Sequence, residues 1–253
     1  MLKVDKLNIE VAGLTVCKDL NLRLRPGMCV GVLGLNGSGK TTLLHTLAGF
    51  LTPASGTVLL DNNSLHAMQA KLRAQKLGCL LQDREFNFPF SVFETAALAR
   101  YSHLARFTLL SRNDNKKIQD ALKLTGLYDK QSQDVRTLSG GEKQRLALAS
   151  IIVQNPKIYL MDEPTNNLDL SYISLIRSIA QNDTKASIMV LHDLSLVDEI
   201  CTHVLLLKSG RFLFGNKESV LNEDNLTWVY ATTIKKIKAD DRNFYICPDS
   251  AKL

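Results

Sequence analysis

The segment GLNGSGKTT, which begins at Gly34, has residue types and spacing suited to holding phosphate. It matches the pattern GxxxxGK[ST], in which glycines let backbone N–H groups wrap phosphate oxygens at a helix N-terminus. Lys40 is placed to reach the β and γ phosphates of a nucleotide, and the hydroxyl of Thr41 to ligate Mg²⁺. An apolar run precedes the segment and a helix-forming run follows it, as the pattern requires. The predicted phosphate site comprises Gly34, Asn36, Gly37, Ser38, Gly39, Lys40, Thr41 and Thr42.

Two adjacent carboxylates, Asp162 and Glu163, close the apolar run IYLMDE. A carboxylate at the end of a buried strand beside a phosphate loop is well placed to hold Mg²⁺ directly or through water. A second carboxylate there can polarise an attacking water. The alternative is that Asp162, Glu163 and Pro164 merely end a strand. With the phosphate loop present, we predict a metal ligand at Asp162 and a catalytic group at Glu163.

Two further polar residues follow apolar runs. His192 ends SIMVLHD, where a lone histidine is more often structural than catalytic; the functional hypothesis is that it bridges the γ phosphate and Glu163. Gln82 follows LGCLL, a position where polar side chains are common, so its functional interpretation depends on the rest of the set.

The stretch TLSGGEKQRLALAS, residues 137–150, supplies a second helix N-terminus with glycines. Ser139 and Glu142 have the S-x-x-E spacing of a capping box, in which each side chain accepts from the backbone N–H of the other residue. A capped helix is therefore a complete structural interpretation. Gly140 and Gly141 nevertheless contribute no helix propensity, and they offer bare N–H groups that a phosphate could approach. The chain is thus predicted to carry a second phosphate-binding device.

Apolar runs must position these groups at strand ends. Residues 29–34, 158–163 and 187–193 are apolar almost throughout, and each closes on candidate groups. Strands that are apolar on both faces are typical of a parallel sheet covered by helices. Residues 2–10 and 14–24 instead alternate apolar and polar side chains, which predicts antiparallel strands with one solvated face. The predicted fold class is α/β, with a mostly parallel core sheet and an N-terminal antiparallel β subdomain.

Helical patterns fill residues 91–154, in the runs VFETAALARYSHLARF, NKKIQDALKLTGLY and EKQRLALASIIVQ. A hairpin with its turn at Ser209 and Gly210 follows later, and the tail contains one more helical stretch and the strand-like FYIC. We predict a single domain over residues 1–253. Its α/β core with the β subdomain covers about 1–85 and 155–222, an inserted helical subdomain about 86–154, and a short C-terminal extension about 223–253.

The composition is that of an ordinary globular protein, with 45% hydrophobic and 22% charged residues. Lys and Arg are scattered, so we interpret the formal charge of +6 as solvated surface and expect no nucleic-acid partner. Five widely separated cysteines without a CxxC pair predict reduced thiols in a cytosolic protein. The N-terminus is unlike a signal peptide, and no apolar run approaches the roughly 18 residues that span a bilayer. Any work at a membrane is therefore expected from the aqueous side.

The set GLNGSGKTT, Gln82, LSGGE, IYLMDEP, NNLD at 166–169 and His192 resembles, in order and approximate spacing, the nucleotide-binding subunit of ABC transporters. The likeness extends over nearly the whole chain, and its most specific element is LSGGE shortly before an apolar run that ends in DE. The resemblance implies a P-loop NTPase fold of the ABC ATPase type, with ATP and Mg²⁺ bound and ATP hydrolysed.

The resemblance also implies a head-to-tail dimer that encloses two ATP molecules. One subunit would contribute its phosphate loop, carboxylates and histidine and the other its LSGGE helix start: Lys40, Asp162, Glu163 and His192 facing Ser139, Gly140, Gly141 and Glu142. Gln82 would sense the γ phosphate and Mg²⁺, joining Thr41 and Asp162 around the metal. Asp169 would communicate across the dimer. A chain with one copy of each motif forms neither complete site alone.

Within that family, the sequence is most similar to the ATPase subunits of iron-siderophore, haem and cobalamin importers. The similarity lies in the length, FETAALARYSHL, LHDLSLV and the tail near FYICP. The expected partners are integral membrane permease subunits and a periplasmic or surface substrate-binding protein. The expected location is peripheral, at the cytoplasmic face of the inner membrane. EFNFPFSVF, beginning at Glu85, is predicted to face a permease's coupling helix, with a role in the core as the alternative.

Two positions depart from the usual family pattern. Val11 stands where an aromatic residue usually stacks on adenine, and no Phe, Trp or Tyr lies in the first 49 residues, which leaves selectivity for ATP over GTP open. Glu142 replaces the commoner glutamine, and because it suits a capping box we expect function to survive.

A soluble ABC ATPase of iron–sulfur cluster assembly, translation or DNA repair is the main alternative. DNA-repair relatives usually carry a long coiled-coil insertion and translation relatives two cassettes, and the sequence has neither. Its length does not exclude the cluster-assembly type. A small-molecule kinase with the same phosphate loop would give LSGGE no role.

Overall fold

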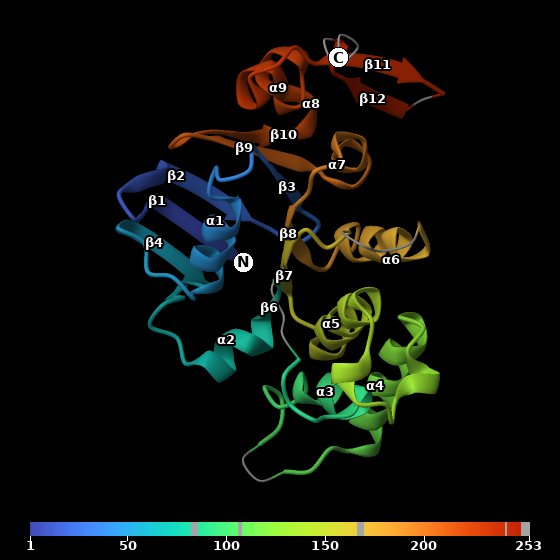
Figure 1. Ribbon diagram of the computed structural model, residues 1–253. Helices are drawn as coiled ribbons and strands as arrows, with labels where there is room; N and C mark the ends of the chain where they lie inside the picture. The colour runs from blue at the N-terminus through green and yellow to red at the C-terminus, as the bar shows by residue number, and fades with distance from the viewer. Residues whose placement is uncertain (82–85, 106–107, 166–169, 241, 249–253) are drawn as a thin grey trace.

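A six-stranded, mostly parallel sheet forms the core of the protein. The computed structural model describes residues 1–81, 86–105, 108–165, 170–240 and 242–248 (Figure 1). The strand order is β10-β9-β3-β8-β7-β6, and every neighbouring pair is parallel except the β9–β10 hairpin. These strands are β3 (Cys29–Leu33), β6 (Leu77–Leu80), β7 (Ile158–Asp162), β8 (Ala186–Val190), β9 (His203–Lys208) and β10 (Arg211–Asn216).

An antiparallel sheet and one helix cover the first face of the core sheet. The antiparallel sheet contains β1 (Leu2–Val11), β2 (Leu14–Leu24), β4 (Ser55–Leu60) and β5 (Asn63–Ser64), in the order β2-β1-β4-β5. Its alternating apolar side chains are buried together with α1 (Lys40–Ala48) and the core strands in one cluster. The alternation seen in the sequence therefore predicted this sheet correctly.

The second face of the core sheet lies under helices. Tyr159 and Met161 of β7 point to this face, while Ile158 and Leu160 point to the first, which explains why the strand is apolar throughout. The covering helices are α5 (Gly140–Gln154), α6 (Leu170–Ala180), α7 (Leu194–Ile200), α8 (Lys217–Val220) and α9 (Glu223–Tyr230). Helix α2 (Ala70–Lys76) leads into β6.

The helical block has a hydrophobic core of its own. Helices α3 (Val92–Leu98), α4 (Arg112–Leu124) and α5 bury a cluster together with the 3₁₀ turns at Tyr128–Lys130 and Val135–Thr137. This separate core supports the proposed inserted helical subdomain. Helix α3 is shorter than the predicted run, because the chain turns after it to bury Arg100, whose Nε donates to Asp114 Oδ1 at 2.9 Å.

The C-terminal segment adds a two-stranded hairpin to the far end of the molecule (Figure 1). The predicted strand FYIC corresponds largely to β12 (Arg242–Ile246), which pairs with β11 (Lys235–Ala239). The sequence did not reveal β11, because its lysine-rich residues are all exposed and carry no apolar pattern.

Two features are absent from the described ranges. No helix in them is both long and apolar enough to cross a bilayer. Nowhere in these ranges do three or more His, Cys, Asp or Glu side chains come close enough together to hold a metal ion.

Cys17, Cys29 and Cys201 are buried free thiols.

Candidate functional site: a nucleotide-phosphate cavity

The glycine loop joins the end of β3 to the start of α1 and leaves its backbone bare. Gly39, the residue before α1, has φ 93°, and a Cβ there would lie 2.5 Å from Val16 Cγ1, so only glycine fits. Gly37 has φ 78°, and a Cβ there would meet no atom within 4 Å, so its backbone faces open space. No side chain caps α1, and its N-terminal donors are therefore available to an anion.

The phosphate loop holds its lysine in place. Lys40 is 7% exposed, and its Nζ donates to the carbonyl oxygens of Gly34 and Leu35 at 2.9 and 3.0 Å. Burial lowers the pKa of Lys40, while Glu163 and Asp162 oppose that shift. An ammonium that is already dehydrated and oriented can bind phosphate with little reorganisation.

A cavity of about 710 Å³ opens in front of this loop. Most of the predicted phosphate residues and all three of the predicted catalytic residues (Lys40, Glu163 and His192) meet in its wall: Asn36, Gly37, Gly39, Lys40, Thr41, Thr42, Glu163 and His192. Gly34 and Ser38 do not line this cavity. A Cβ on Gly34 would lie 2.4 Å from the Leu207 carbonyl oxygen, and Ser38 Oγ is buried. These two residues therefore shape the loop from behind.

Asp162 ends β7 as a deeply buried carboxylate. It is 1% exposed, and neither of its oxygens has a hydrogen-bond partner among the described residues. Burial raises its pKa, and the neighbouring Thr41 hydroxyl lowers it. A buried carboxylate without a partner is costly unless a cation compensates it. Carboxylate and hydroxyl oxygens are the ligands that Mg²⁺ prefers, so Asp162 and Thr41 fit the predicted metal.

Glu163 and His192 are in direct contact. Because β7 and β8 are neighbours, the residues that follow them meet at one edge of the sheet. His192 Nε2 lies 2.6 Å from Glu163 Oε1, as the bridging hypothesis for His192 requires. Glu163 has a left-handed backbone, with φ 49°, and its N–H donates to the Val190 carbonyl. Such strain in a non-glycine residue is common at functional sites.

The second phosphate device is a complete capping box at the start of α5. Ser139 N donates to Glu142 Oε2 at 2.8 Å, and Glu142 N donates to Ser139 Oγ at 3.3 Å. Hydrogen bonds from Lys130 and Ser139 lower the pKa of Glu142 to about 2. A Cβ on Gly140 would meet no atom within 4 Å, so the backbone at the helix start is accessible. Among the described residues that line the phosphate cavity, none belongs to α5.

Two predicted site residues, Gln82 and Asp169, lie outside the described residues.

A second cavity continues the phosphate cavity on the side of the β1–β2 turn, sharing Asn36, Gly37, Gly39 and Thr42 with it. Val11 and Leu14, which pair across the turn, line it together with Leu35. The sequence pointed to Val11 but not to Leu14 or Leu35; the short Ala12–Gly13 turn, which brings Leu14 back beside Val11, was the available signal. The described lining also includes polar residues, among them Thr15, Lys208 and Ser209, and it contains no Phe, Tyr or Trp.

The family model described as "ABC transporter" matches residues 17–166. The chain belongs to the ABC transporter family. The match includes the phosphate loop, the capped start of α5 and both carboxylates.

Named relatives within the ABC transporter family cover most of the chain. The cobalamin import ATP-binding protein BtuD of Halobacterium salinarum is 33% identical over 89% of this chain. The chain spans only 57% of that relative's length. The hemin import ATP-binding protein HmuV of Pseudomonas entomophila is 37% identical over 83% of this chain and 84% of its own length.

Solved structures confirm the ABC ATPase fold predicted from the sequence. A structure described as a metal-chelate type ABC transporter, in an inward-facing conformation, matches with a TM-score of 0.83 and 26% identity over 100% of this chain and 99% of its own. A dimeric ATP-binding cassette in a post-hydrolysis state, bound to ADP and Pi, matches with a TM-score of 0.72 and 26% identity over 84% and 98% of the two chains.

Proposed function

We propose that this chain is the ATP-binding and ATP-hydrolysing subunit of an ABC importer for a metal-chelate type substrate, such as an iron-siderophore, haem or cobalamin. Relatives named for cobalamin and hemin import, and the similarity to a metal-chelate type transporter, support the substrate class. The phosphate cavity supports the nucleotide, because it joins a bare helix N-terminus, a buried lysine and a buried carboxylate.

The observation that carries this proposal is the separation of the two phosphate devices. The cavity in front of α1 has a phosphate loop, Glu163 and His192, while the exposed backbone of Gly140 at the start of α5 opens elsewhere. A helix start that is accessible but remote from its own cavity can serve the nucleotide of a second copy. The proposed working unit is therefore a head-to-tail dimer with two ATP molecules between the subunits, and the dimeric cassette found among the similar structures supports it.

In this proposal each residue of the cavity has a separate task. Lys40 neutralises charge on the transferring phosphoryl group, and Thr41 and Asp162 hold Mg²⁺, joined by Gln82. When bound, Mg²⁺ supplies Lewis-acid stabilisation of the phosphate oxygens. Glu163 polarises the attacking water, and His192, 2.6 Å away, orients that carboxylate and contacts the γ phosphate. Ser139, Gly140 and Gly141 complete the site from the partner subunit, and Asp169 connects the two sites.

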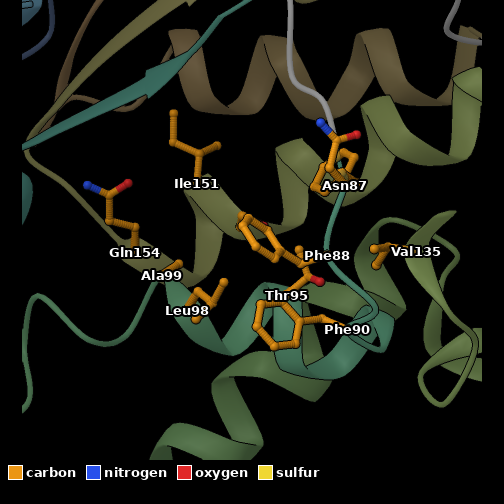
Figure 2. A pocket seen from close by; sticks show the side chains of 11 residues that line it. Asn87, Phe88, Phe90, Thr95, Leu98, Ala99, Val135, Ile151 and Gln154 are labelled. Carbon is orange, nitrogen blue, oxygen red and sulfur yellow. The ribbon is translucent and has the colours of Figure 1, made fainter.

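A permease would dock on an apolar groove in the helical subdomain. A cavity of about 380 Å³ lies between the start of this subdomain and α3 and α5, with Phe88, Phe90 and Leu98 in its wall (Figure 2). Phe88 is 69% exposed and stacks on Phe90 with ring centroids 5.9 Å apart, whereas Phe86 and Phe93 pack against buried clusters. In the aromatic segment, the exposed Phe88 therefore fits the predicted contact with a permease, and Phe86 and Phe93 fit the alternative role in the core. Its exposed part supports a peripheral position against integral membrane subunits at the cytoplasmic face of the inner membrane.

The decisive experiment uses Glu163→Gln, which keeps the shape of the side chain but removes the carboxylate. We expect nucleotide binding to remain, turnover to fall by about 10²- to 10⁴-fold, and an ATP-bound dimer to accumulate, because closure no longer leads to hydrolysis. Phosphate release and sedimentation velocity with and without ATP measure both effects. Wild-type turnover in this variant would sink the assignment of Glu163.

Isolation of the protein from detergent-solubilised membranes tests the transport role separately. Co-isolation of a multi-span membrane protein, with a substrate-binding protein encoded beside it, supports import. Co-isolation of a soluble scaffold protein instead supports the cluster-assembly alternative.

A further inference from the structure

One tyrosine connects a helix of the core to the helical subdomain. The hydroxyl of Tyr172, on α6, accepts a hydrogen bond from Arg145 Nη1 of α5 at 2.6 Å. It donates to the carbonyl of Thr125, at the end of α4, at 3.2 Å. The Arg145 guanidinium also lies over the tyrosine ring, with Cζ 5.2 Å from the centroid. We call these contacts of Tyr172, Arg145 and Thr125 the Tyr172 bridge.

The end of α4 has room for this hydroxyl. Gly126 follows Thr125 with φ 63°, and a Cβ there would lie 2.9 Å from Tyr172 Oη. The carbonyl of Thr125 is one of the last carbonyls of α4, which have no partner within their own helix. Tyr172, on a helix of the core, therefore supplies a hydrogen-bond donor to the C-terminal end of α4, a helix of the helical subdomain. Helix α6 itself packs on the core sheet through Ile176 and Ala180 (Figure 1).

The bridge continues to the capping box of α5. Arg145 Nη2 lies 4.0 Å from Glu142 Oε1, and Glu142 Oε2 accepts from the Ser139 backbone at 2.8 Å. Lys130 donates to the same carboxylate. A displacement of Arg145 would therefore remove positive charge beside the group that fixes the start of α5.

The α5 end of the bridge lies one helical turn from the proposed nucleotide-contacting start of that helix, because Arg145 is three residues after Glu142. We propose that Tyr172 is a positioning residue, which fixes the N-terminus of α5 relative to the core helix α6 so that the start of α5 is held ready to reach the partner's ATP. This inference rests on the ATP-enclosing dimer proposed above.

The bridge should affect closure of the dimer without affecting nucleotide binding by a single subunit. The described lining of the phosphate cavity contains neither Tyr172 nor Arg145. Tyr172→Phe keeps the ring and removes the hydroxyl. The bridge forms within a single subunit, so its loss acts by letting α5 leave the position that closes the dimer. The loss of one net hydrogen bond lowers the population of that position by up to about fivefold, and a symmetric dimer needs two such subunits, so we expect dimerisation to weaken by up to about 25-fold.

The test compares E163Q with E163Q/Y172F and with E163Q/Y128F. Tyr128→Phe is the control, because it removes a phenol hydroxyl from the helical subdomain that the bridge contacts, where the Lys123 ammonium lies 4.8 Å from the ring centroid. Sedimentation equilibrium with Mg–ATP gives the dimer dissociation constant. Binding of a fluorescent ATP analogue to dilute monomer gives the affinity of the phosphate cavity, and thermal melts report stability.

The inference is supported if Y172F alone weakens the dimer several-fold, by up to about 25-fold, while monomer affinity stays within about twofold of the parent. Equal dimer constants in all three proteins, with or without a lower melting temperature for Y172F, would overturn it and leave the proposed function intact. Failure of E163Q itself to dimerise with ATP would overturn the dimer and the bridge together. If Y172F does not fold, Arg145→Met removes the donor and keeps the aliphatic stem, and the same criterion applies.

Discussion

Helices α1 and α5 each have an exposed glycine at or just before their first turn, Gly37 and Gly140, yet their N-termini are built in opposite ways. Helix α1 starts at a left-handed Gly39 with no side-chain cap. Helix α5 starts at Ser139 with both hydrogen bonds of a capping box in place. The first start depends on a ligand to complete its hydrogen bonds, whereas the second is already stable without one.

This difference matches the separation of the two sites. Ligand-dependent donors lie beside Lys40 and Asp162, which supply the other groups that a Mg-nucleotide needs. The start of α5 already has both hydrogen bonds of its capping box, so it keeps its conformation before the proposed partner subunit brings a nucleotide to it. The uncapped start of α1 therefore fits the primary binding site, and the capped start of α5, with its exposed Gly140, fits the proposed contact in trans.

The largest expected effect comes from Gly39→Ala, which damages the uncapped start. The new Cβ would lie 2.5 Å from Val16 Cγ1 in a left-handed backbone. Strain of about 1–3 kcal/mol corresponds to a loss of about 5- to 150-fold in ATP affinity. Equilibrium dialysis against the wild type measures it. Gly140→Ala is the control, because a Cβ there meets no atom within 4 Å; equal losses in both variants would contradict the comparison.

Ser139→Ala removes the side-chain cap of α5. Unlike Gly39→Ala, we expect it to lower stability and hydrolysis but not the affinity of the monomer for ATP. The loss of the cap costs about 1 kcal/mol of stability. Because we propose that this helix start contacts the partner's nucleotide, we expect hydrolysis to fall by about tenfold, the scale of one lost charge-assisted hydrogen bond to phosphate. Affinity of the monomer for ATP should not change. Reduced ATP binding by monomeric S139A would show that the two starts share one site.

Val11→Tyr should raise the affinity of the primary site for ATP, by a smaller factor than the preceding changes lower affinity or hydrolysis. The cavity beside the phosphate loop has no aromatic residue in its described lining, and its aliphatic residues Val11 and Leu14 are both exposed. An aromatic ring there would add about 0.5–1.5 kcal/mol of stacking, or about 2- to 12-fold in affinity for ATP. We also expect the wild type to bind GTP within about tenfold of ATP, since no aromatic ring among the described lining residues holds the base. Competition binding measures both values, with Val11→Ile as control.

The smallest effect concerns Glu142→Gln at the capped start. The folded-state pKa of Glu142, about 2, lies below its usual 4.5, so its carboxylate adds stability that is fully present above pH 4.5. That stability disappears as the pH falls toward 2. Glutamine keeps the capping geometry but not the charge. The melting temperature of E142Q should therefore be lower than that of the wild type at about pH 7, and the two curves should converge as the pH falls to about 2.

The sequence predicted the local features of the site and the order of the elements. The phosphate loop and the Ser139 capping box depend on residues close together in the chain, so their spacing alone was informative. The meeting of Glu163 with His192 also followed, because both end apolar runs that pair as parallel neighbours. The roles of Gln82 and Asp169 remain predictions.

Features that depend on packing between distant segments were not predictable in this way. Tyr172 and Arg145 are 27 residues apart, and neither stands out by residue type or periodicity. The early end of α3 depends on the burial of Arg100 against Asp114, which the helical pattern of the sequence does not reveal. The exposed strand β11 has no buried face, so hydrophobic alternation could not mark it.

We expect the buried carboxylate of Asp162 to link the lifetime of the protein to the supply of nucleotide. Without Mg²⁺, the folded state carries the cost of a dehydrated charge that Thr41 and Lys40 offset only in part, because burial still raises the pKa of Asp162, whereas the unfolded chain does not carry this cost. Any ligand that binds only the folded state shifts the folding equilibrium in proportion to its concentration over its dissociation constant. Subunits in an energy-depleted cell would open more often and be exposed to proteases, so the abundance of the transporter would follow the energy that it consumes.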